Sequence, residues 1–150
     1  MSRRDDRRHA LCLIFSMDFH LGEGDYRSPK QAFEYYAANF ANEVVAGGKI
    51  SEPDYVLRVF AWTYANHEEI DGMIAKTSDS WDFERISKVD LAIMRLAIYE
   101  ILHEEEIAQS VSINEAVELA KEFSTEEASK FINGILGKIA RGIDGESLSF

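Results

Sequence analysis

Apolar residues recur every three or four positions along almost the whole chain, and few helix-breaking residues interrupt them. Proline occurs only at Pro29 and Pro53, whereas alanine, glutamate, leucine and isoleucine are abundant. No segment shows the apolar–polar alternation that is typical of a β-strand. At 150 residues the chain is long enough for one domain with a full core. The pattern therefore predicts an all-α fold, a single-domain helical bundle of about six to seven helices.

Helix start and stop signals divide this pattern into segments. The signals are Gly22 and Gly24 after the first helix, Ser28 and Pro29 at the start of the second, Gly47 and Gly48 at its end, Ser51 before the third, and Ser87 as the cap of the fourth. Residues 112–115 and 124–127 match capping boxes, which predict the starts of the last two helices. Asn133-Gly134 lies inside the last apolar stripe, so we expect a helix there in which the glycine permits close packing.

The charge is distributed unevenly. Four arginines and two aspartates give residues 1–9 a net charge of +2, against −11 for the whole chain, so the remaining residues carry −13. An acidic body repels nucleic-acid phosphates and suits a basic protein partner. A molecule of this kind could hold a nucleic acid at one place and a cationic protein at another, although acidity that serves only solubility is the alternative.

The sequence contains no apolar run long enough for a membrane span or for the core of a signal peptide. Its one cysteine, Cys12, lies in the apolar run ALCLIF, where burial is the expected role. These features predict a cytoplasmic protein without membrane association and without an intrachain disulfide.

Motifs for catalysis or for cofactor binding are absent from the sequence, including HExxH, paired CxxC, GxSxG and glycine-rich phosphate loops. The four histidines lack metal-ligand spacing, so no metal and no cofactor are expected. Glu100 falls on the packed stripe of the fourth helix and would need a partner there, such as an arginine or amides at a helix start. The sequence thus predicts a protein that is not an enzyme.

The N-terminal arginines have the spacing of one helical surface. Arg3, Arg4, Arg7 and Arg8 fall at i, i+1, i+4 and i+5. Guanidinium groups match phosphate geometry, and a mobile arm that leads into a helix can follow an RNA backbone. A solubilising terminus is the alternative interpretation.

A second basic and aromatic group lies near the C-terminus. Lys130 precedes Phe131, and Lys121 and Phe123 lie one helix earlier. Lysine beside an aromatic ring can hold a phosphate and stack an unpaired base. The alternative, which the pattern favours for at least one phenylalanine, is that the rings belong to the core.

Two long stretches, WDFERISKVDLAIMRLAIYEIL and SVSINEAVELAKEFSTEEASKFINGILGKIAR, resemble the second half of the bacterial NusB transcription antitermination family. INEAVELAK and KFINGIL carry the resemblance most specifically, and the arginine motif followed by ALCLIF is similar to the family's opening. Between residues 20 and 80 the likeness is limited to helix pattern and length. The resemblance implies two packed three-helix subdomains that bind single-stranded boxA RNA of nascent ribosomal RNA transcripts. It also implies a heterodimer with the small-subunit ribosomal protein that serves as NusE, acting on RNA polymerase with other Nus factors.

The resemblance also implies roles for particular residues. The RNA-binding positions are Arg3, Arg4, Arg7, Phe123, Glu127, Lys130 and Phe131, and the positions that face the ribosomal protein are Asp90 and Arg95. Asp5 and Asp6 depart from the family pattern, and we expect them to weaken RNA binding by the chain alone. The predicted domain covers residues 1–141, with a frayed tail at 142–150.

Two other functions are compatible with the resemblance. One is the RNA-binding accessory domain of a ribosomal RNA cytosine methyltransferase, although residues 1–150 leave no room for a cofactor-binding domain. The other is a regulator that sequesters NusE without binding RNA.

Overall fold

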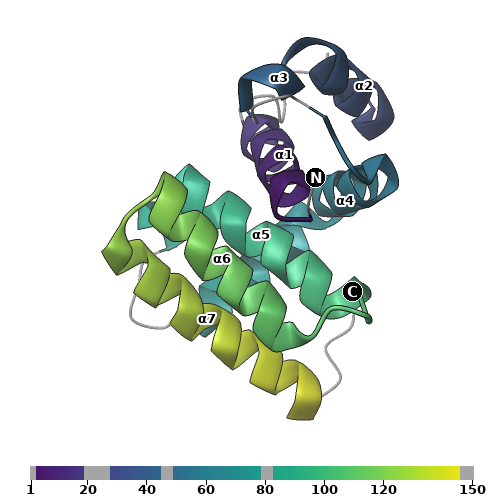
Figure 1. Cartoon of the computed structure of the whole chain (residues 1–150). Helices are drawn as coiled ribbons and strands as arrows, with labels where there is room; N and C mark the ends of the chain where they lie inside the picture. Colours follow the sequence, from purple (N-terminus) through teal and green to yellow (C-terminus); the bar gives the residue numbers. More distant parts are fainter. Residues whose placement is uncertain (1–2, 19–27, 45–48, 79–82, 146–150) are drawn as a thin grey trace. The chain divides into compact units, whose positions relative to one another are not determined.

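The computed structural model describes residues 3–18, 28–44, 49–78 and 83–145, and its regular secondary structure there is entirely helical, as predicted (Figure 1). The chain divides into two compact units, residues 1–65 and 66–150. The helices are α1 (Arg3–Met17), α2 (Pro29–Asn39), α3 (Ala41–Val44), α4 (Pro53–Thr77), the 3₁₀ turn η1 (Phe83–Arg85), α5 (Lys88–His103), α6 (Gln109–Phe123) and α7 (Glu126–Gly145). The predicted ends of the first two helices, at residues 22–24 and 47–48, lie outside the described residues.

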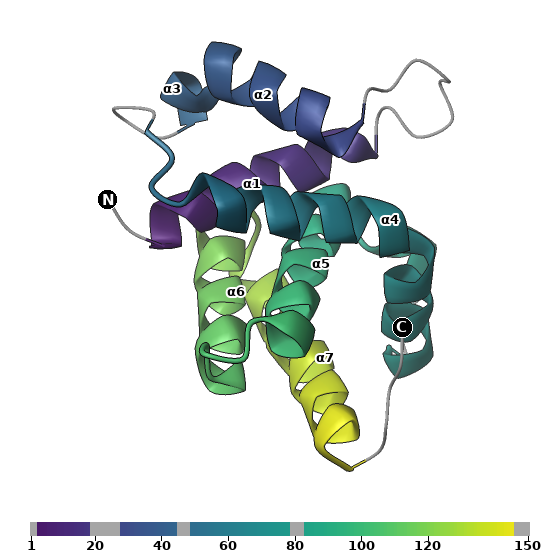
Figure 2. The same ribbon diagram turned by 90° about the vertical axis from the view of Figure 1, so that its right-hand side faces the viewer.

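The first unit is built from α1, α2, α3 and the first part of α4. In this unit α1 and the start of α4 lie side by side, and α1 also contacts α2 and α3 (Figures 1 and 2). The buried apolar side chains of α1 and α4 form its core: Ala10, Leu13, Ile14, Met17, Val56, Val59 and Phe60. Because the apolar stripe of α1 begins only at Ala10, the arginines occupy its first two turns.

The second helix starts as predicted and ends earlier than predicted. Ser28 and Gln31 form a capping box, and Pro29 is the first helical residue. The helix stops at Phe40, which leaves helical geometry with φ −125° and ψ −16°, and the short α3 follows. Tyr36 is the buried residue of α2, whereas Phe40 at its end is 42% exposed, so this segment does not form one continuous buried stripe.

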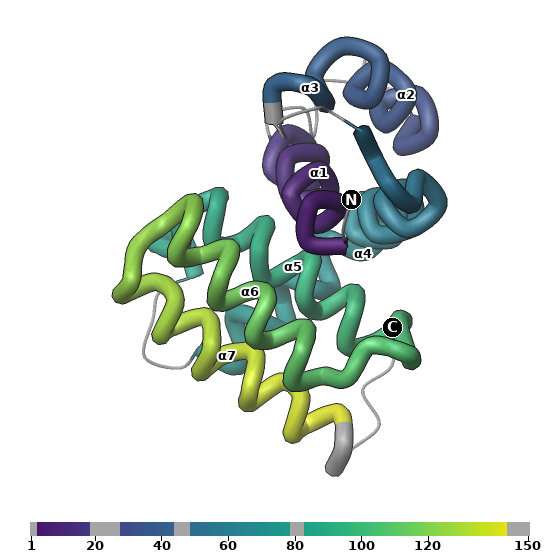
Figure 3. Tube along the Cα trace, viewed as in Figure 1, coloured from purple at the N-terminus to yellow at the C-terminus, as the bar shows by residue number. Residues whose placement is uncertain are grey.

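The second unit contains the end of α4 together with α5, α6 and α7. The last three helices lie side by side and contact one another pairwise, and short connections join them (Figures 2 and 3). Every residue of α5 from Leu91 to Ile101 is buried, which makes this helix the centre of the unit. Ser87 caps α5 as predicted, since its hydroxyl accepts a hydrogen bond from the Asp90 amide at 3.1 Å.

A break inside α4 marks the boundary between the two units. Asn66 has φ −119° and ψ 16°, which interrupts the helical path, and the second unit begins at this residue. The sequence shows one continuous apolar stripe here, and neither glycine nor proline stands at the break.

Two predicted capping boxes are placed wrongly. Helix α6 begins at Gln109, so Ser112 lies inside it, where its hydroxyl donates to the buried Glu100 Oε1 at 2.7 Å. Glu100 thus has a partner of the kind that its burial requires, and this partner is a serine hydroxyl. For α7 the cap is Thr125, whose Oγ1 accepts from the Ala128 amide at 2.9 Å. Helix α6 begins one turn before the predicted box, so Ser112 is an interior residue that donates to a buried carboxylate, which local spacing cannot reveal.

The C-terminal helix contains Asn133-Gly134 as predicted, but the reason differs. A Cβ atom built on Gly134 would meet nothing within 4 Å, so this glycine is not required for close packing. The helix continues past residue 141 to Gly145, where a frayed tail was predicted, and residues 146–150 lie outside the described residues.

Candidate nucleic-acid interface

The four N-terminal arginines have very different exposures. Arg4 is exposed, Arg3 and Arg8 are half-buried, and only 6% of Arg7 is exposed. All four lie within α1, whose helical geometry begins at Arg3. The predicted mobile arm is therefore the first two turns of a helix, and Arg4 is the member that presents its charge most openly.

Arg3 is held by two residues from the start of α4. Its Nη2 donates a hydrogen bond to Glu52 Oε2, and its guanidinium lies over the Tyr55 ring, 4.0 Å from the ring centroid. Cation–π stacking fixes the plane of the guanidinium and leaves its edge available for hydrogen bonds. Arg3 therefore stands in a defined orientation before any ligand binds.

The two aspartates of the arginine segment have structural partners. Asp5 pairs with Arg8, with 2.7 Å between Oδ1 and Nη1. Asp6 is fully buried, and its two carboxylate oxygens accept hydrogen bonds from the amides of Ser51 and Glu52, at 2.8 Å each. These amides precede α4, so Asp6 serves as a cap supplied by another helix. Its charge is directed into the unit and away from a ligand on the surface.

The second predicted group lies at the adjoining ends of α6 and α7. Phe123 is the last residue of α6 and is 42% exposed, while Glu127 and Lys130 are exposed in the first two turns of α7. Phe131 is half-buried. Neither phenylalanine is a core residue, so the interpretation that at least one of them is core is wrong.

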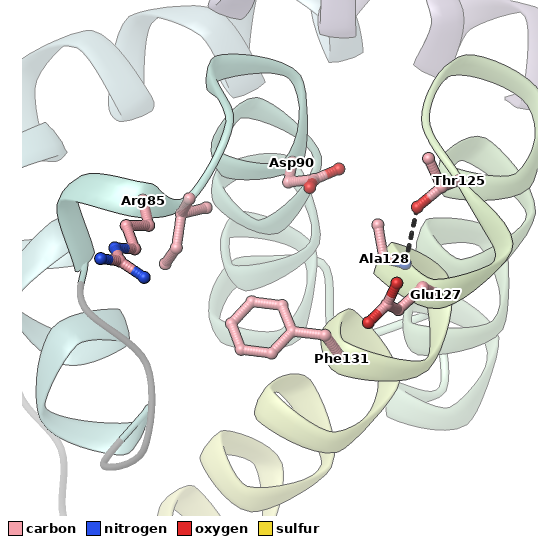
Figure 4. Close-up of a pocket in the computed structure, with 7 residues that line it drawn as sticks. Arg85, Asp90, Thr125, Glu127, Ala128 and Phe131 are labelled. Atoms are coloured by element: carbon pink, nitrogen blue, oxygen red, sulfur yellow. Dashed lines mark hydrogen bonds between the residues drawn. The ribbon is translucent and has the colours of Figure 1, made fainter.

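Phe131 and Glu127 line a hollow of about 200 Å³ within the second unit, together with Asp90 at the start of α5 (Figure 4). Arg85 of η1 lies on the other side of the hollow. The remaining lining residues are Ile86, Thr125 and Ala128. The buried Oδ1 of Asp90 has no hydrogen-bond partner among the described residues. The structure thus brings Asp90, predicted to face a protein, next to two residues predicted to face RNA.

Arg95 is an interior residue. Only 2% of its side chain is exposed, and it makes a two-point ion pair with Asp71 of α4. Nε donates to Oδ1 at 2.9 Å and Nη2 donates to Oδ2 at 2.6 Å. This geometry ties the end of α4 to α5 and leaves little of Arg95 for a direct contact with a partner.

A buried polar cluster joins α1 to α2 directly after the arginine segment. His9 Nδ1 lies 2.6 Å from the Tyr36 hydroxyl. Burial lowers the pKa of His9, although Asp6, the Lys49 backbone and Asp5 act in the opposite direction. Burial also raises the pKa of the Cys12 thiol, although a hydrogen bond with Tyr36 acts in the opposite direction. In the ranges that the structure describes, no three His, Cys, Asp or Glu side chains gather as a metal site would require.

Several residues that shape the site were missed by sequence reasoning. Asp6 contacts the amides of residues 51 and 52, which lie about 45 residues further along the chain. Glu52 and Tyr55, at the start of α4, contact Arg3 of α1. Glu52 and Tyr55 carried no signal of their own, because a glutamate and a tyrosine at a helix start are ordinary. The charge of Asp6 was noticed, but its burial could not be inferred locally.

Together these features define a class, an all-helical binding protein whose candidate site uses guanidinium, ammonium and aromatic groups. No helix among the described residues has the length and apolar character of a membrane span. The arginine group belongs to the first unit and the Lys130 group to the second. That both contact one ligand stays a prediction.

Comparison with known proteins gives the family. The NusB family model matches residues 4–141, and the chain belongs to this family. It is 44% identical over 143 residues to the transcription antitermination protein NusB of Acetivibrio thermocellus, covering 94% of this chain and 90% of that protein. It is 52% identical over 147 residues to the NusB of Clostridium botulinum strain Kyoto, covering 93% and 99%. A solved structure of T. maritima NusB matches with a TM-score of 0.73 and 29% identity, covering 94% and 92%.

Proposed function

We propose that this chain is a transcription antitermination factor of the bacterial cytoplasm, which binds boxA RNA as a heterodimer with the ribosomal protein NusE. In this function it acts without catalysis and connects nascent ribosomal RNA to the Nus factors on RNA polymerase. The single observation that carries the proposal is family membership over residues 4–141, which covers α1 from Arg4 onward and α7 as far as Arg141.

The arginine helix suits a phosphate backbone. Arg4 is exposed, and Arg3 holds its guanidinium in a fixed plane over Tyr55. Guanidinium groups form two-point hydrogen bonds with phosphate oxygens. Such contacts position the RNA without reading its sequence.

The start of α7 suits an unpaired base. Lys130 is exposed in α7, the ring of Phe131 next to it in the chain is half-buried, and Phe123 is 42% exposed at the end of α6. A base that stacks on an aromatic ring gains about 1–3 kcal/mol, and single-stranded RNA can turn its bases outward to do so. Reading of the base edge would then come from polar side chains near the ring, of which Glu127 is one.

The acidic remainder of the chain suits a basic ribosomal protein. Asp90 is the proposed contact with this protein. Its carboxylate lines the hollow, and its Oδ1 has no hydrogen-bond partner among the described residues. A buried carboxylate oxygen without a donor favours a partner that supplies one. Arg95 would act indirectly, by holding the helix that presents Asp90.

Titration of labelled boxA RNA with and without NusE tests the proposal. With NusE at saturation, we expect boxA RNA to bind at least about tenfold more tightly than a scrambled RNA of the same composition, because hydrogen bonds to base edges can supply the about 1.4 kcal/mol that a tenfold difference requires. Affinity should fall with salt, with a slope of about −0.7 for each phosphate contacted on a single strand.

Three outcomes separate the candidate functions. Equal affinity for boxA and scrambled RNA would remove the proposal. Binding of NusE without binding of either RNA would favour the sequestering regulator instead. A methyltransferase accessory role would require preference for a structured ribosomal RNA substrate over single-stranded boxA.

Replacing Arg4 and Arg7 separately by alanine should distinguish a surface contact from a buried one. We expect Arg4→Ala to weaken RNA binding for all sequences and to reduce the salt slope by about 0.7, with stability changed by less than about 0.5 kcal/mol. Arg7→Ala should also lower the free energy of unfolding, by about 1–3 kcal/mol, because Arg7 is 6% exposed. Salt-dependent RNA titration and urea denaturation measure the two effects. Equal stability losses in both variants would contradict the assignment.

A further inference from the structure

In the folded chain the carboxylate of Glu52 contacts Arg3, one of the arginines proposed to bind RNA. Glu52 accepts a hydrogen bond from Arg3 Nη2, and the two side chains remain partly open to solvent, at 53% for Glu52 and 30% for Arg3. A carboxylate and a phosphate offer the same arrangement of acceptor oxygens to a guanidinium. The contact is therefore of the kind that an RNA phosphate would make.

We propose that Glu52 is an intramolecular competitor for the RNA phosphate at Arg3, and so sets the affinity of the arginine helix for RNA. The inference rests on the proposed function, and it adds a residue that opposes binding to those expected to promote it. In the free protein Glu52 neutralises Arg3, and in the complex a phosphate replaces Glu52 on the same edge of the guanidinium.

The surroundings of Arg3 favour exchange of Glu52 over displacement of Arg3. Tyr55 is only 1% exposed, and the Arg3 guanidinium stacks on its ring. The Glu52 amide is fixed to Asp6, so the helix start stays in place while the glutamate side chain swings into solvent. Movement of one half-exposed side chain is cheap, and the freed glutamate regains rotamer entropy. Arg3 can thus keep its orientation throughout the exchange.

The size of the effect follows from the exposure of the pair. Exposed ion pairs contribute little, and an ion pair of this kind reduces phosphate binding by about two- to fivefold. The charge of Glu52 also repels the incoming phosphate, and salt screens both effects. Because phosphate contacts carry no sequence information, the effect should be the same for every single-stranded RNA.

The test compares Glu52→Gln with Asp54→Asn in the full chain, each with and without Arg3→Ala. Asp54 is an exposed acid in the first turn of the same helix, so its variant removes the same charge without touching Arg3. Labelled boxA RNA and scrambled RNA are titrated at low and high salt with NusE at saturation, and urea denaturation checks each fold. We expect Glu52→Gln to bind both RNAs about two- to fivefold more tightly, the gain shrinking at high salt, and Asp54→Asn to change affinity by less than about 1.5-fold. In the Arg3→Ala background the gain from Glu52→Gln should vanish.

Each other result overturns the inference. Weaker binding by Glu52→Gln would mean that the glutamate positions Arg3 for RNA instead of competing with it. An equal gain in Asp54→Asn, or a gain that persists without Arg3, would mean that only the overall charge matters. Failure of the proposed function is separate, because it would show as loss of discrimination between boxA and scrambled RNA in the unaltered chain.

Discussion

Replacing Asp71 by asparagine is expected to lower the free energy of unfolding by about 3 kcal/mol, since it removes the carboxylate that makes a two-point ion pair with the buried Arg95 guanidinium. Arg95 is 2% exposed and Asp71 is 21% exposed, so the arginine cannot turn to water when its partner is lost. The amide that replaces one carboxylate oxygen would also direct its own N–H groups at those of Arg95. Urea denaturation followed by circular dichroism measures the change.

The matched control is Glu69→Gln, an exposed acid on the same stretch of α4. It should change stability by less than about 0.5 kcal/mol. The double variant Asp71→Asn with Arg95→Met should recover part of the loss, because it also removes the buried charge that Asp71 had balanced. A loss of less than about 1 kcal/mol in the single variant would show that the ion pair does not hold α4 to α5.

Asp6→Ala is expected to cost about 2 kcal/mol, the second largest effect. The variant leaves the amides of Ser51 and Glu52 without their acceptor at the start of α4, in a place where Asp6 itself is fully buried. The variant Asp6→Asn keeps one acceptor oxygen, so its free energy of unfolding should fall by less than that of Asp6→Ala. Denaturation in urea, combined with RNA titration, would follow both stability and the presentation of Arg3.

Asp5→Ala provides the comparison for this variant. Asp5 pairs with Arg8 at a partly exposed position, where an ion pair contributes about 0–1 kcal/mol. If the two aspartate variants lost the same amount of stability, the role of Asp6 as a cap supplied by α1 would be wrong.

These two variants bear on function through the positions of other residues. Asp71 contacts Arg95 on the helix that begins next to Asp90, and Asp6 fixes the amide of the residue that holds Arg3. Partner binding and RNA binding should therefore be measured only on variants whose folded fraction is known. Loss of binding with retained helicity would separate a displaced contact from an unfolded unit.

Much of the fold could be predicted because its signals are local. The all-helical architecture follows from apolar spacing and scarce prolines, and the caps at Ser28 and Ser87 follow from residues within one turn of each other. The predicted capping box at residues 112–115 was wrong because α6 begins one turn earlier, at Gln109, and Ser112 lies inside the helix against a carboxylate twelve residues away. The break at Asn66 has no local signal, since the apolar period continues across it.

The sequence by itself determined which segments are helical, which family the chain resembles, and that its positive charge is concentrated at one end, since each depends on neighbouring residues in the chain. Only the tertiary structure decided what that charge can do. Burial of Arg7 and Arg95, the hydrogen bonds that Asp6 accepts, and the carboxylate of Glu52 beside Arg3 all arise between residues brought together from different helices. The exposure and pairing of a charge depend on its neighbours in space, and the order of residues along the chain does not specify those neighbours.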